Sequence, residues 1–504
     1  MSLARVLTRA QLGIEAPLVI VEVHLSAGLP SLSLVGLPET AVKESKDRVR
    51  SALLNSGFDF PAKRITINLA PADLPKEGGR YDLAIALGIL AASGQVPEKS
   101  LEGHEFIGEL TLGGELQPVP GVLPCALQSG KDNHVLVVPA ANAGEASLCS
   151  SAECRAAGTL LEVTGYLHGQ NRLAEVDSGR PAAVHFAEAA DLADVRGQPQ
   201  ARRALEIAAA GGHNLLFIGP PGTGKTMLAS RLPGILPPME EEEALVAASV
   251  SSISGQATDW QEQWRVRPFR APHPTASGVA LVGGGATPKP GEISLAHAGV
   301  LFLDELPEYS RKVLDVLREP LESGRIVISR ASRSITFPAQ FQLIAAMNPC
   351  PCGYFGDPSG RCRCTAEQIR RYQGQTSGPL LDRIDLHVEV PPMPPALLQQ
   401  APPGESSAAV QQRVMAARQC QLDRQGCTNA GLSGNQRDEV CQLTADDQAW
   451  LMTAIEHLQL SARGFHRILK IARTIADLEG TQQTGRAHLM EALGYRTLDR
   501  YLQS

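Results

Sequence analysis

The stretch Asn214-Leu-Leu-Phe-Ile-Gly-Pro-Pro-Gly-Thr-Gly-Lys-Thr226 decides the fold of this chain. Its apolar start predicts a short buried strand, and Met-Leu-Ala-Ser after it continues as a helix. A glycine-rich turn between a strand and a helix is the context that a phosphate loop requires, because its backbone amides can face phosphate oxygens at the positive end of the helix. The predicted nucleotide-binding residues are Gly219, Pro220, Pro221, Gly222, Thr223, Gly224, Lys225 and Thr226. The alternative is a chance match in a loop, which the flanking strand and helix disfavour.

Two acids follow a second apolar strand about 75 residues later, in Val300-Leu-Phe-Leu-Asp-Glu305. Lys225 would contact the outer phosphates of ATP, and Thr226 and Asp304 would hold Mg²⁺. Glu305 would polarise the attacking water. The alternative is a solvated strand end. Together with the phosphate loop, the two acids predict an ATPase that uses ATP and Mg²⁺.

Three more polar residues are candidates for contact with the γ-phosphate. Asn348 ends the apolar strand predicted for residues 341–347, which would place it beside the loop. Arg383 and Arg463 are the charged candidates, although a single arginine is more often part of a surface salt bridge than of a catalytic site.

Length and composition limit the remaining choices. A chain of 504 residues is too long for one hydrophobic core, so two or three domains are expected. The formal net charge of −7 argues against a wholly basic nucleic-acid coat. The N-terminus has no secretory signal, and no apolar run is long enough to span a membrane. Six scattered cysteines fit reduced, buried thiols, so we expect a cytoplasmic protein with no membrane partner.

The chain divides into an α/β multidomain pattern. Residues 1–170 alternate short β-branched runs with helical stretches. PLVIVEVHL, RITINLA, HVLVVPA and LLEVTGY are predicted strands, and a helix is predicted over residues 39–55. Residues 171–190 are interpreted as a linker. Residues 191–395 form a second α/β domain around the nucleotide motifs, and residues 396–504 an all-helical segment.

Four further cysteines form two close pairs, Cys350-Pro-Cys352 and Cys362-Arg-Cys364, with nine residues between the pairs. Four thiolates can bind Zn²⁺ tetrahedrally. The one-residue spacing inside each pair is unusual for zinc, and inert surface cysteines are the alternative. A bound Zn²⁺ would be structural and would clamp the loop after Asn348.

Long motifs in the chain resemble a known family. GGHNLLFIGPPGTGKTMLASRLPGILP, GEISLAHAGVLFLDELPE, AAMNPCPCGYFGD, SGPLLDRIDLHVEVP and LSARGFHRILKIARTIADLEG are similar to the magnesium-chelatase-like AAA+ ATPases, and the whole chain resembles the ComM (YifB) family. The resemblance implies an AAA+ phosphate-loop α/β domain followed by a C-terminal helical lid. It implies that Asn348 is the sensor-1 residue, Arg383 the arginine finger and Arg463 the sensor-2 residue. Because such fingers reach a neighbouring subunit, it also implies a ring, with a hexamer expected.

The N-terminal segment resembles the Lon protease domain, a ribosomal S5 domain 2-like α/β fold. The similarity lies in LAPADLPKEGGRYD (residues 69–82) and IGELTLGGEL (residues 107–116). Arg80 stands at the place of the nucleophilic serine, and Leu123 falls near that of the lysine. Because arginine cannot be an acyl nucleophile, we expect a protease-like scaffold without peptidase activity.

The family is associated with a helicase that drives branch migration while transforming DNA is integrated. A DNA motor needs cations along its path, since phosphate contacts give affinity without sequence preference. A hairpin predicted over residues 325–337 would place Arg330 and Arg333 at its tip, although a solvated turn is the alternative. Arg267 and Arg270 are a second candidate pair for DNA contact. Two other functions remain: a chelatase-type motor that remodels a protein partner, and an ATP-dependent protease, which Arg80 disfavours.

Overall fold

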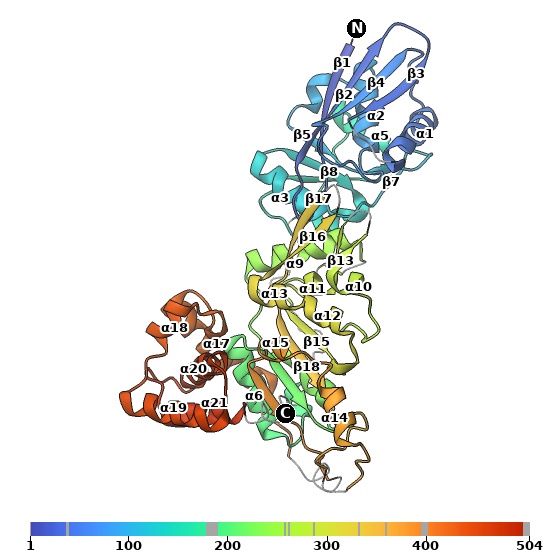
Figure 1. Ribbon diagram of the computed structural model, residues 1–504. Coiled ribbons are helices and arrows are strands. Elements are labelled where there is room, and N and C mark those ends of the chain that lie inside the picture. Colours follow the sequence, from blue (N-terminus) through green and yellow to red (C-terminus); the bar gives the residue numbers. More distant parts are fainter. Residues whose placement is uncertain are drawn as a thin grey trace.

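The computed structural model describes residues 2–36, 40–177, 190–256, 259–260, 263–285, 288–330, 333–357, 360–394 and 402–496. They form three parts: an N-terminal α/β part, a central α/β part, and a C-terminal group of helices beside the central part (Figure 1). The predicted α/β multidomain fold is therefore confirmed. Among the described residues, no helix combines the length and apolar character needed to cross a membrane.

The N-terminal part is built on an eight-stranded mixed sheet with the order β10-β9-β8-β5-β1-β2-β4-β3. Strand β1 pairs antiparallel with β2 and parallel with β5, which joins an antiparallel half of the sheet to a parallel half. A separate short hairpin, β6–β7, stands beside the sheet. The strands are β1 (Ser2–Arg9), β2 (Leu18–Ser26), β3 (Ser31–Val35), β4 (Arg64–Ala70), β5 (His104–Phe106), β6 (Glu109–Leu110), β7 (Leu116–Gln117), β8 (Val135–Pro139), β9 (Cys154–Ala157) and β10 (Ala174–Glu175).

The helices of this part are α1 (Thr40–Asn55), α2 (Asp82–Ala92), α3 (Val122–Asp132), α4 (Ala143–Ala146) and α5 (Leu160–Leu167). Helix α2 is buried along almost its whole length and packs on β1 and β2. The predicted helix over 39–55 and three of the four predicted strands are confirmed. The fourth prediction was wrong, because LLEVTGY forms α5 and not a strand. Thr159 caps this helix by accepting a hydrogen bond from Glu162 N, and Leu160, Val163 and Leu167 are buried at helical spacing.

Strand β10 pairs with β9, so the first sheet continues into the stretch that we interpreted as a linker. The rest of that stretch, residues 178–189, lies outside the described part of the chain.

The central part contains a five-stranded parallel sheet with the order β12-β15-β18-β11-β19. Its three middle strands are almost entirely buried, as expected for a parallel sheet covered on both faces. The strands are β11 (Leu215–Ile218), β12 (Phe269–Arg270), β15 (Val300–Leu303), β18 (Gln342–Met347) and β19 (Leu386–Glu389). The helices around the sheet include α6 (Pro199–Gly211), α7 (Lys225–Ser230), α9 (Glu241–Ser254) and α14 (Ala366–Gln373).

The predicted hairpin is present as β16 (Arg325–Arg330) and β17 (Arg333–Pro338), and it extends from the central part toward the N-terminal part (Figure 1). Its side chain Ile335 packs against the turn at Gly13, where an added Cβ would lie 2.8 Å from Ile335 Cγ2. Helix α9 makes a second junction, since Ser252 O accepts a hydrogen bond from Gly121 N at 3.2 Å. Apolar side chains of both parts share one buried cluster there, which includes Val122 and Trp264. The two α/β parts are therefore held together by a packed interface.

The C-terminal helices are α17 (Ser407–Gln425), α18 (Gly434–Val440), α19 (Ala445–Leu458), α20 (Ala462–Leu478) and α21 (Arg486–Gly494). Helices α17 and α20 both pack on α6, which precedes the phosphate loop strand. The predicted helical character of this segment is confirmed. Buried residues of these helices and of β11 belong to one hydrophobic cluster, so the helical segment is anchored to the nucleotide domain.

Candidate functional site

The glycine-rich turn leaves the carboxyl end of β11 and enters α7. Gly222 and Gly224 have φ angles of 78° and 88°, a left-handed conformation that favours glycine. Pro221 and Gly222 are exposed, so this turn faces solvent. The sequence thus forms the predicted strand, turn and helix, with the turn open to a ligand.

Lys225 is buried at the start of α7, and its Nζ lies among oxygen acceptors. It donates to Gly219 O at 2.7 Å, to Pro220 O at 2.8 Å and to Asn348 Oδ1 at 3.1 Å. Burial lowers the pKa of Lys225, while the charges of Asp304 and Glu305 act in the opposite direction. The ammonium group is therefore oriented inside the turn and close to both acids.

Thr226 and Asp304 meet beside this lysine. Thr226 Oγ1 donates to Asp304 Oδ2 at 2.6 Å, although the residues are far apart in the sequence. Hydroxyl and carboxylate oxygens are the ligands that Mg²⁺ prefers, and Mg²⁺ usually needs only one or two of them because it keeps several waters. The donor set at this point fits Mg²⁺, with Thr226 and Asp304 as the residues that would hold it.

Glu305 follows Asp304 at the end of β15 and has an exposed side chain. Its backbone has a left-handed φ of 51°, and its N–H donates to Asp304 Oδ1 at 2.9 Å. A non-glycine residue in this conformation is uncommon and often marks a functional turn. The turn separates the two neighbouring carboxylates, one toward Thr226 and one toward solvent.

Asn348 comes to the site because of the strand order. Strand β18 lies between β15 and β11, and all three run in the same direction. Their carboxyl ends therefore meet at one edge of the sheet, where ligands bind in open α/β folds. Lys225, Asp304, Glu305 and Asn348 are gathered at this edge, as the sequence predicted.

Arg383 and Arg463 are not part of this cluster. Arg383 Nη1 donates to Pro379 O at 2.6 Å, and its Nη2 pairs with Glu322. Arg463 is 64% exposed, and its Nη1 lies 3.8 Å from Asp382 Oδ2. The two arginines are therefore near each other, through the neighbours Asp382 and Arg383, and away from the phosphate loop of their own chain. The partners Glu322 and Asp382 were not identified from the sequence, because no local pattern links them to these arginines.

The two arginines at the hairpin tip, Arg330 and Arg333, face each other across the last pair of the β16–β17 ladder. Their side chains lie outside what the structure describes. The predicted position at the tip is therefore confirmed for the backbone, and contact with DNA stays a prediction.

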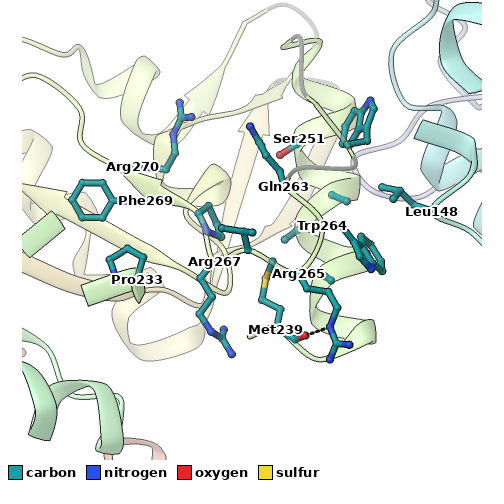
Figure 2. A pocket seen from close by; sticks show the side chains of 16 residues that line it. Leu148, Pro233, Met239, Ser251, Gln263, Trp264, Arg265, Arg267, Phe269 and Arg270 are labelled. Atoms are coloured by element: carbon teal, nitrogen blue, oxygen red, sulfur yellow. Dashed lines mark hydrogen bonds between the residues drawn. The ribbon is translucent and has the colours of Figure 1, made fainter. Parts of the chain in front are cut away.

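The other predicted DNA-binding arginines have partners inside the protein. Arg267 donates to Pro237 O and to Ala298 O, each at 2.6 Å, and Arg270 forms a two-point ion pair with Glu292. Both line a cavity of about 400 Å³ together with Met239, Trp264 and Phe269 (Figure 2). No phosphate-loop residue lines this cavity. Their contacts give both arginines a structural task, and their contact with DNA remains a prediction.

In the N-terminal part, Arg80 is buried, donates to Gln11 Oε1 at 2.9 Å and also bonds Pro120 O. Leu123 is buried at the start of α3. Burial raises the pKa of the neighbouring Cys125 to about 11, so its thiol stays protonated near neutral pH. Around Arg80, the described residues thus provide an internal hydrogen-bond network and no activated nucleophile. The absence of peptidase activity stays a prediction.

The fold and the site define the class: an α/β protein with a phosphate loop at the carboxyl edge of a parallel sheet. Residues 191–398 match the family described as magnesium chelatase, subunit ChlI. Residues 21–142 match the subunit ChlI of Mg-chelatase, and residues 404–496 match the ChlI C-terminal family.

Among known proteins, YifB of Salmonella typhimurium is 55% identical over 100% of this chain and 98% of its own length. The competence protein ComM of Haemophilus influenzae is 54% identical over 100% of this chain and 99% of its own. The magnesium-chelatase 38 kDa subunit of Rhodobacter capsulatus is 27% identical over 58% of this chain and 82% of its own. The chain belongs to the magnesium-chelatase-like family that includes ComM and YifB.

Proposed function

We propose that this chain is an ATP-hydrolysing motor of the AAA+ type. The observation that carries the proposal is the meeting of Lys225, Thr226, Asp304 and Asn348 at one edge of the parallel sheet. ATP hydrolysis depends mainly on positioning and charge stabilisation, and these side chains provide both. Membership in a family named for magnesium chelatase supports the same activity.

Each residue has a distinct task in this proposal. The amides of residues 219–224 and the ammonium group of Lys225 hold the phosphates, and Thr226 and Asp304 hold Mg²⁺, which neutralises phosphate charge when bound. The exposed carboxylate of Glu305 accepts a hydrogen bond from the attacking water and orients it. Asn348 has an amide that can bond the γ-phosphate or that water, and its present bond to Lys225 keeps it at the correct place.

A single chain does not complete this site, because Arg383 and Arg463 point to other partners. We infer that the subunits form a ring, with six as the expected number, and that both arginines contact ATP bound to a neighbouring subunit. A heterologous contact of this kind closes into a ring when its rotation allows. The N-terminal part is then a Lon-like scaffold for assembly or DNA contact, and the C-terminal helices act as a lid on the nucleotide site.

We further propose that the substrate is DNA, and that the motor is a helicase driving branch migration during integration of transforming DNA. The 54% identity with the Haemophilus influenzae competence protein over nearly complete chains supports a role in competence. The hairpin with Arg330 and Arg333 at its tip supports a DNA contact. The substrate would be single-stranded or branched.

The experiment is an ATP-dependent strand-displacement assay on forked and three-stranded DNA, with Lys225→Ala as the inactive control. The proposal expects displacement by the wild-type protein alone. A second candidate, a chelatase-type motor that remodels a protein partner, is favoured by the match to the Rhodobacter capsulatus chelatase subunit. ATP turnover that no DNA stimulates would favour this second candidate.

A further inference from the structure

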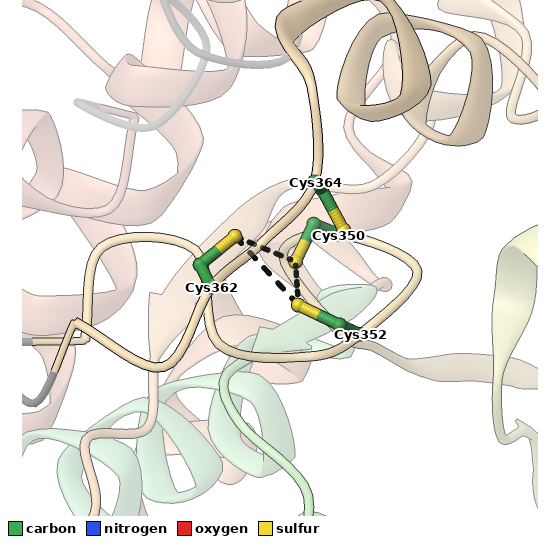
Figure 3. A group of neighbouring side chains, drawn as sticks. All are labelled: Cys350, Cys352, Cys362 and Cys364. Carbon is green, nitrogen blue, oxygen red and sulfur yellow. Dashed lines mark hydrogen bonds between the residues drawn. The ribbon is translucent and has the colours of Figure 1, made fainter.

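Four cysteine sulfurs gather in the loop that follows Asn348 (Figure 3). The Sγ of Cys350 lies 3.3 Å from that of Cys352 and 3.8 Å from that of Cys362, and Cys352 and Cys362 are 3.6 Å apart. The Sγ of Cys364 completes a group in which all four atoms lie within 4.8 Å of one another. Two short segments of chain thus direct their thiols to one point.

These distances match a tetrahedral metal site and not a disulfide. With Zn–S bonds of about 2.3 Å, the sulfurs at the corners of a tetrahedron are about 3.8 Å apart. A disulfide would bring two sulfurs to about 2.05 Å, which none of the pairs above approaches. Four sulfur ligands in this geometry select Zn²⁺ over Mg²⁺ or Ca²⁺, which prefer oxygen.

The surrounding loop has few other contacts to hold it in place. Between Met347 and Ala366, the described residues form neither helix nor strand. Their order rests on turn bonds such as Gly353 N to Cys350 O at 2.9 Å, and on Arg361, which lies 4.7 Å over the ring of Tyr354. Cys352 is exposed and two of the other thiols are partly exposed, so hydrophobic burial does not explain why they converge.

The loop touches the nucleotide site at two points. Cys350 follows Asn348 by two residues, and Asn348 Oδ1 accepts from Lys225 Nζ. Gly353 packs directly on the phosphate loop, since a Cβ added there would lie 2.6 Å from Pro221 Cδ. A constraint on the cysteines is therefore a constraint on both Asn348 and Pro221.

We propose that Cys350, Cys352, Cys362 and Cys364 bind one Zn²⁺ ion, and that this ion fixes the loop against the phosphate loop. The site is structural, because four protein ligands leave no open position on the metal. It stands independently of the proposed DNA activity, since metal binding needs neither ATP nor DNA. Its consequence for the nucleotide site is that loss of the metal weakens ATP binding without removing any residue that contacts ATP.

The first test measures metal in full-length protein that was purified without chelator and under reducing conditions. Elemental analysis should find about one zinc per chain, falling about tenfold or more in the double variant Cys352→Ser/Cys364→Ser. Cys420→Ser is the matched control, because Cys420 is also exposed but lies on α17, outside the cluster. Zinc at the same level in the double variant, or no transition metal in the wild type, would overturn the proposal.

A second measurement remains decisive if the double variant does not fold. Wild-type protein is stripped of metal and loaded with Co²⁺, which absorbs visible light strongly when four thiolates surround it. The proposal expects this spectrum, and expects Zn²⁺ to displace it. A stripped protein that shows no thiolate spectrum, or that carries a Cys350–Cys352 disulfide under reducing conditions, contradicts the site.

The coupling to the nucleotide is tested by ATP binding in the absence of DNA. Stripped protein should bind a fluorescent ATP analogue several-fold more weakly than zinc-loaded protein, and added Zn²⁺ should restore the affinity. Equal affinities would refute the coupling. Because neither measurement involves turnover or DNA, failure here is distinguishable from failure of the proposed motor function.

Discussion

The residues of the nucleotide site could be predicted because each stands at the end of an apolar run. Lys225, Asp304 and Asn348 follow strands that the sequence marks by composition alone. Their contacts, such as Lys225 Nζ to Asn348 Oδ1 at 3.1 Å, follow once three parallel strands end at one edge. The partners of Arg383 and Arg463 could not be predicted, because pairing between distant surface charges leaves no periodic signal.

Two substitutions should separate ATP binding from hydrolysis. Lys225→Ala removes the ammonium group from the phosphate loop and should weaken ATP binding and abolish turnover. Glu305→Gln keeps the shape of the side chain but cannot accept a proton, so it should retain binding while turnover falls by about 10² to 10⁴-fold. Equilibrium ATP binding and steady-state phosphate release measure the two effects. Normal turnover by Glu305→Gln would show that this carboxylate does not orient the water.

A buried histidine should make stability depend on pH. Burial lowers the pKa of His297 to about 4, and its Nδ1 accepts a hydrogen bond from Gln340 N at 3.1 Å. The unfolded chain takes up this proton near pH 6.5, whereas the folded protein does so only near pH 4. Stability should therefore fall as pH drops through this window, by up to about 3 kcal/mol from this group.

The measurement is the midpoint of urea unfolding between pH 7.5 and 4.5 for the wild type and for His297→Asn. The variant lacks the titrating group, so its midpoint should change less over this range, whatever its absolute stability. Parallel curves for the two proteins would show that His297 does not titrate as its burial requires.

At the scale of elements, hydrophobic pattern predicted the strands of the central sheet, the hairpin and the C-terminal helices. It failed for residues 160–166, where β-branched and aromatic residues suggested a strand. The chain forms α5 there, because Thr159 caps it and Leu160, Val163 and Leu167 bury one helical face. A short apolar run does not separate a strand from a helix by periodicity alone, and its packing partners decide the outcome.

The hairpin β16–β17 should behave as a DNA-binding element through its tip. Arg330→Ala together with Arg333→Ala should weaken binding to single-stranded DNA, and the slope of log affinity against log salt should decrease by about 1 to 2. ATP binding should stay normal, since the phosphate loop is on other elements. Fluorescence anisotropy across a salt series gives both affinity and slope.

The matched control is Arg325→Ala, which removes the same charge at the base of the hairpin, opposite Pro338. It should leave the affinity nearly unchanged. If the tip variant unwinds and binds DNA like the wild type, the hairpin is a solvated turn.

At the scale of the whole molecule, the sequence divided the chain into parts but did not predict how they pack. The contact of Ile335 with the turn at Gly13, and the bond between Gly121 N and Ser252 O, join residues more than a hundred positions apart. Local periodicity carries no information on such contacts. They fix the hairpin to the N-terminal part, so DNA held at the hairpin tip would lie near that part.

Arg383 should act on the ATP of a neighbouring subunit. Arg383→Ala should lower turnover by about 10³-fold or more, as loss of an arginine finger does. An equal mixture of Lys225→Ala and Arg383→Ala chains should regain activity, because some sites then combine an intact phosphate loop with a neighbour's intact arginine. Random mixing in a ring makes about a quarter of the sites complete. Phosphate release by the mixture measures the recovery, and two inactive variants that stay inactive when mixed would place Arg383 in its own site.

The central claim is that the pocket formed by Lys225, Thr226, Asp304, Glu305 and Asn348 hydrolyses ATP to move DNA. The most direct measurement is steady-state ATP turnover by the purified full-length protein with Mg²⁺, without DNA and then with single-stranded, forked and three-stranded DNA. The account predicts turnover that DNA stimulates and that Lys225→Ala abolishes. Absence of turnover with every one of these polynucleotides would contradict it.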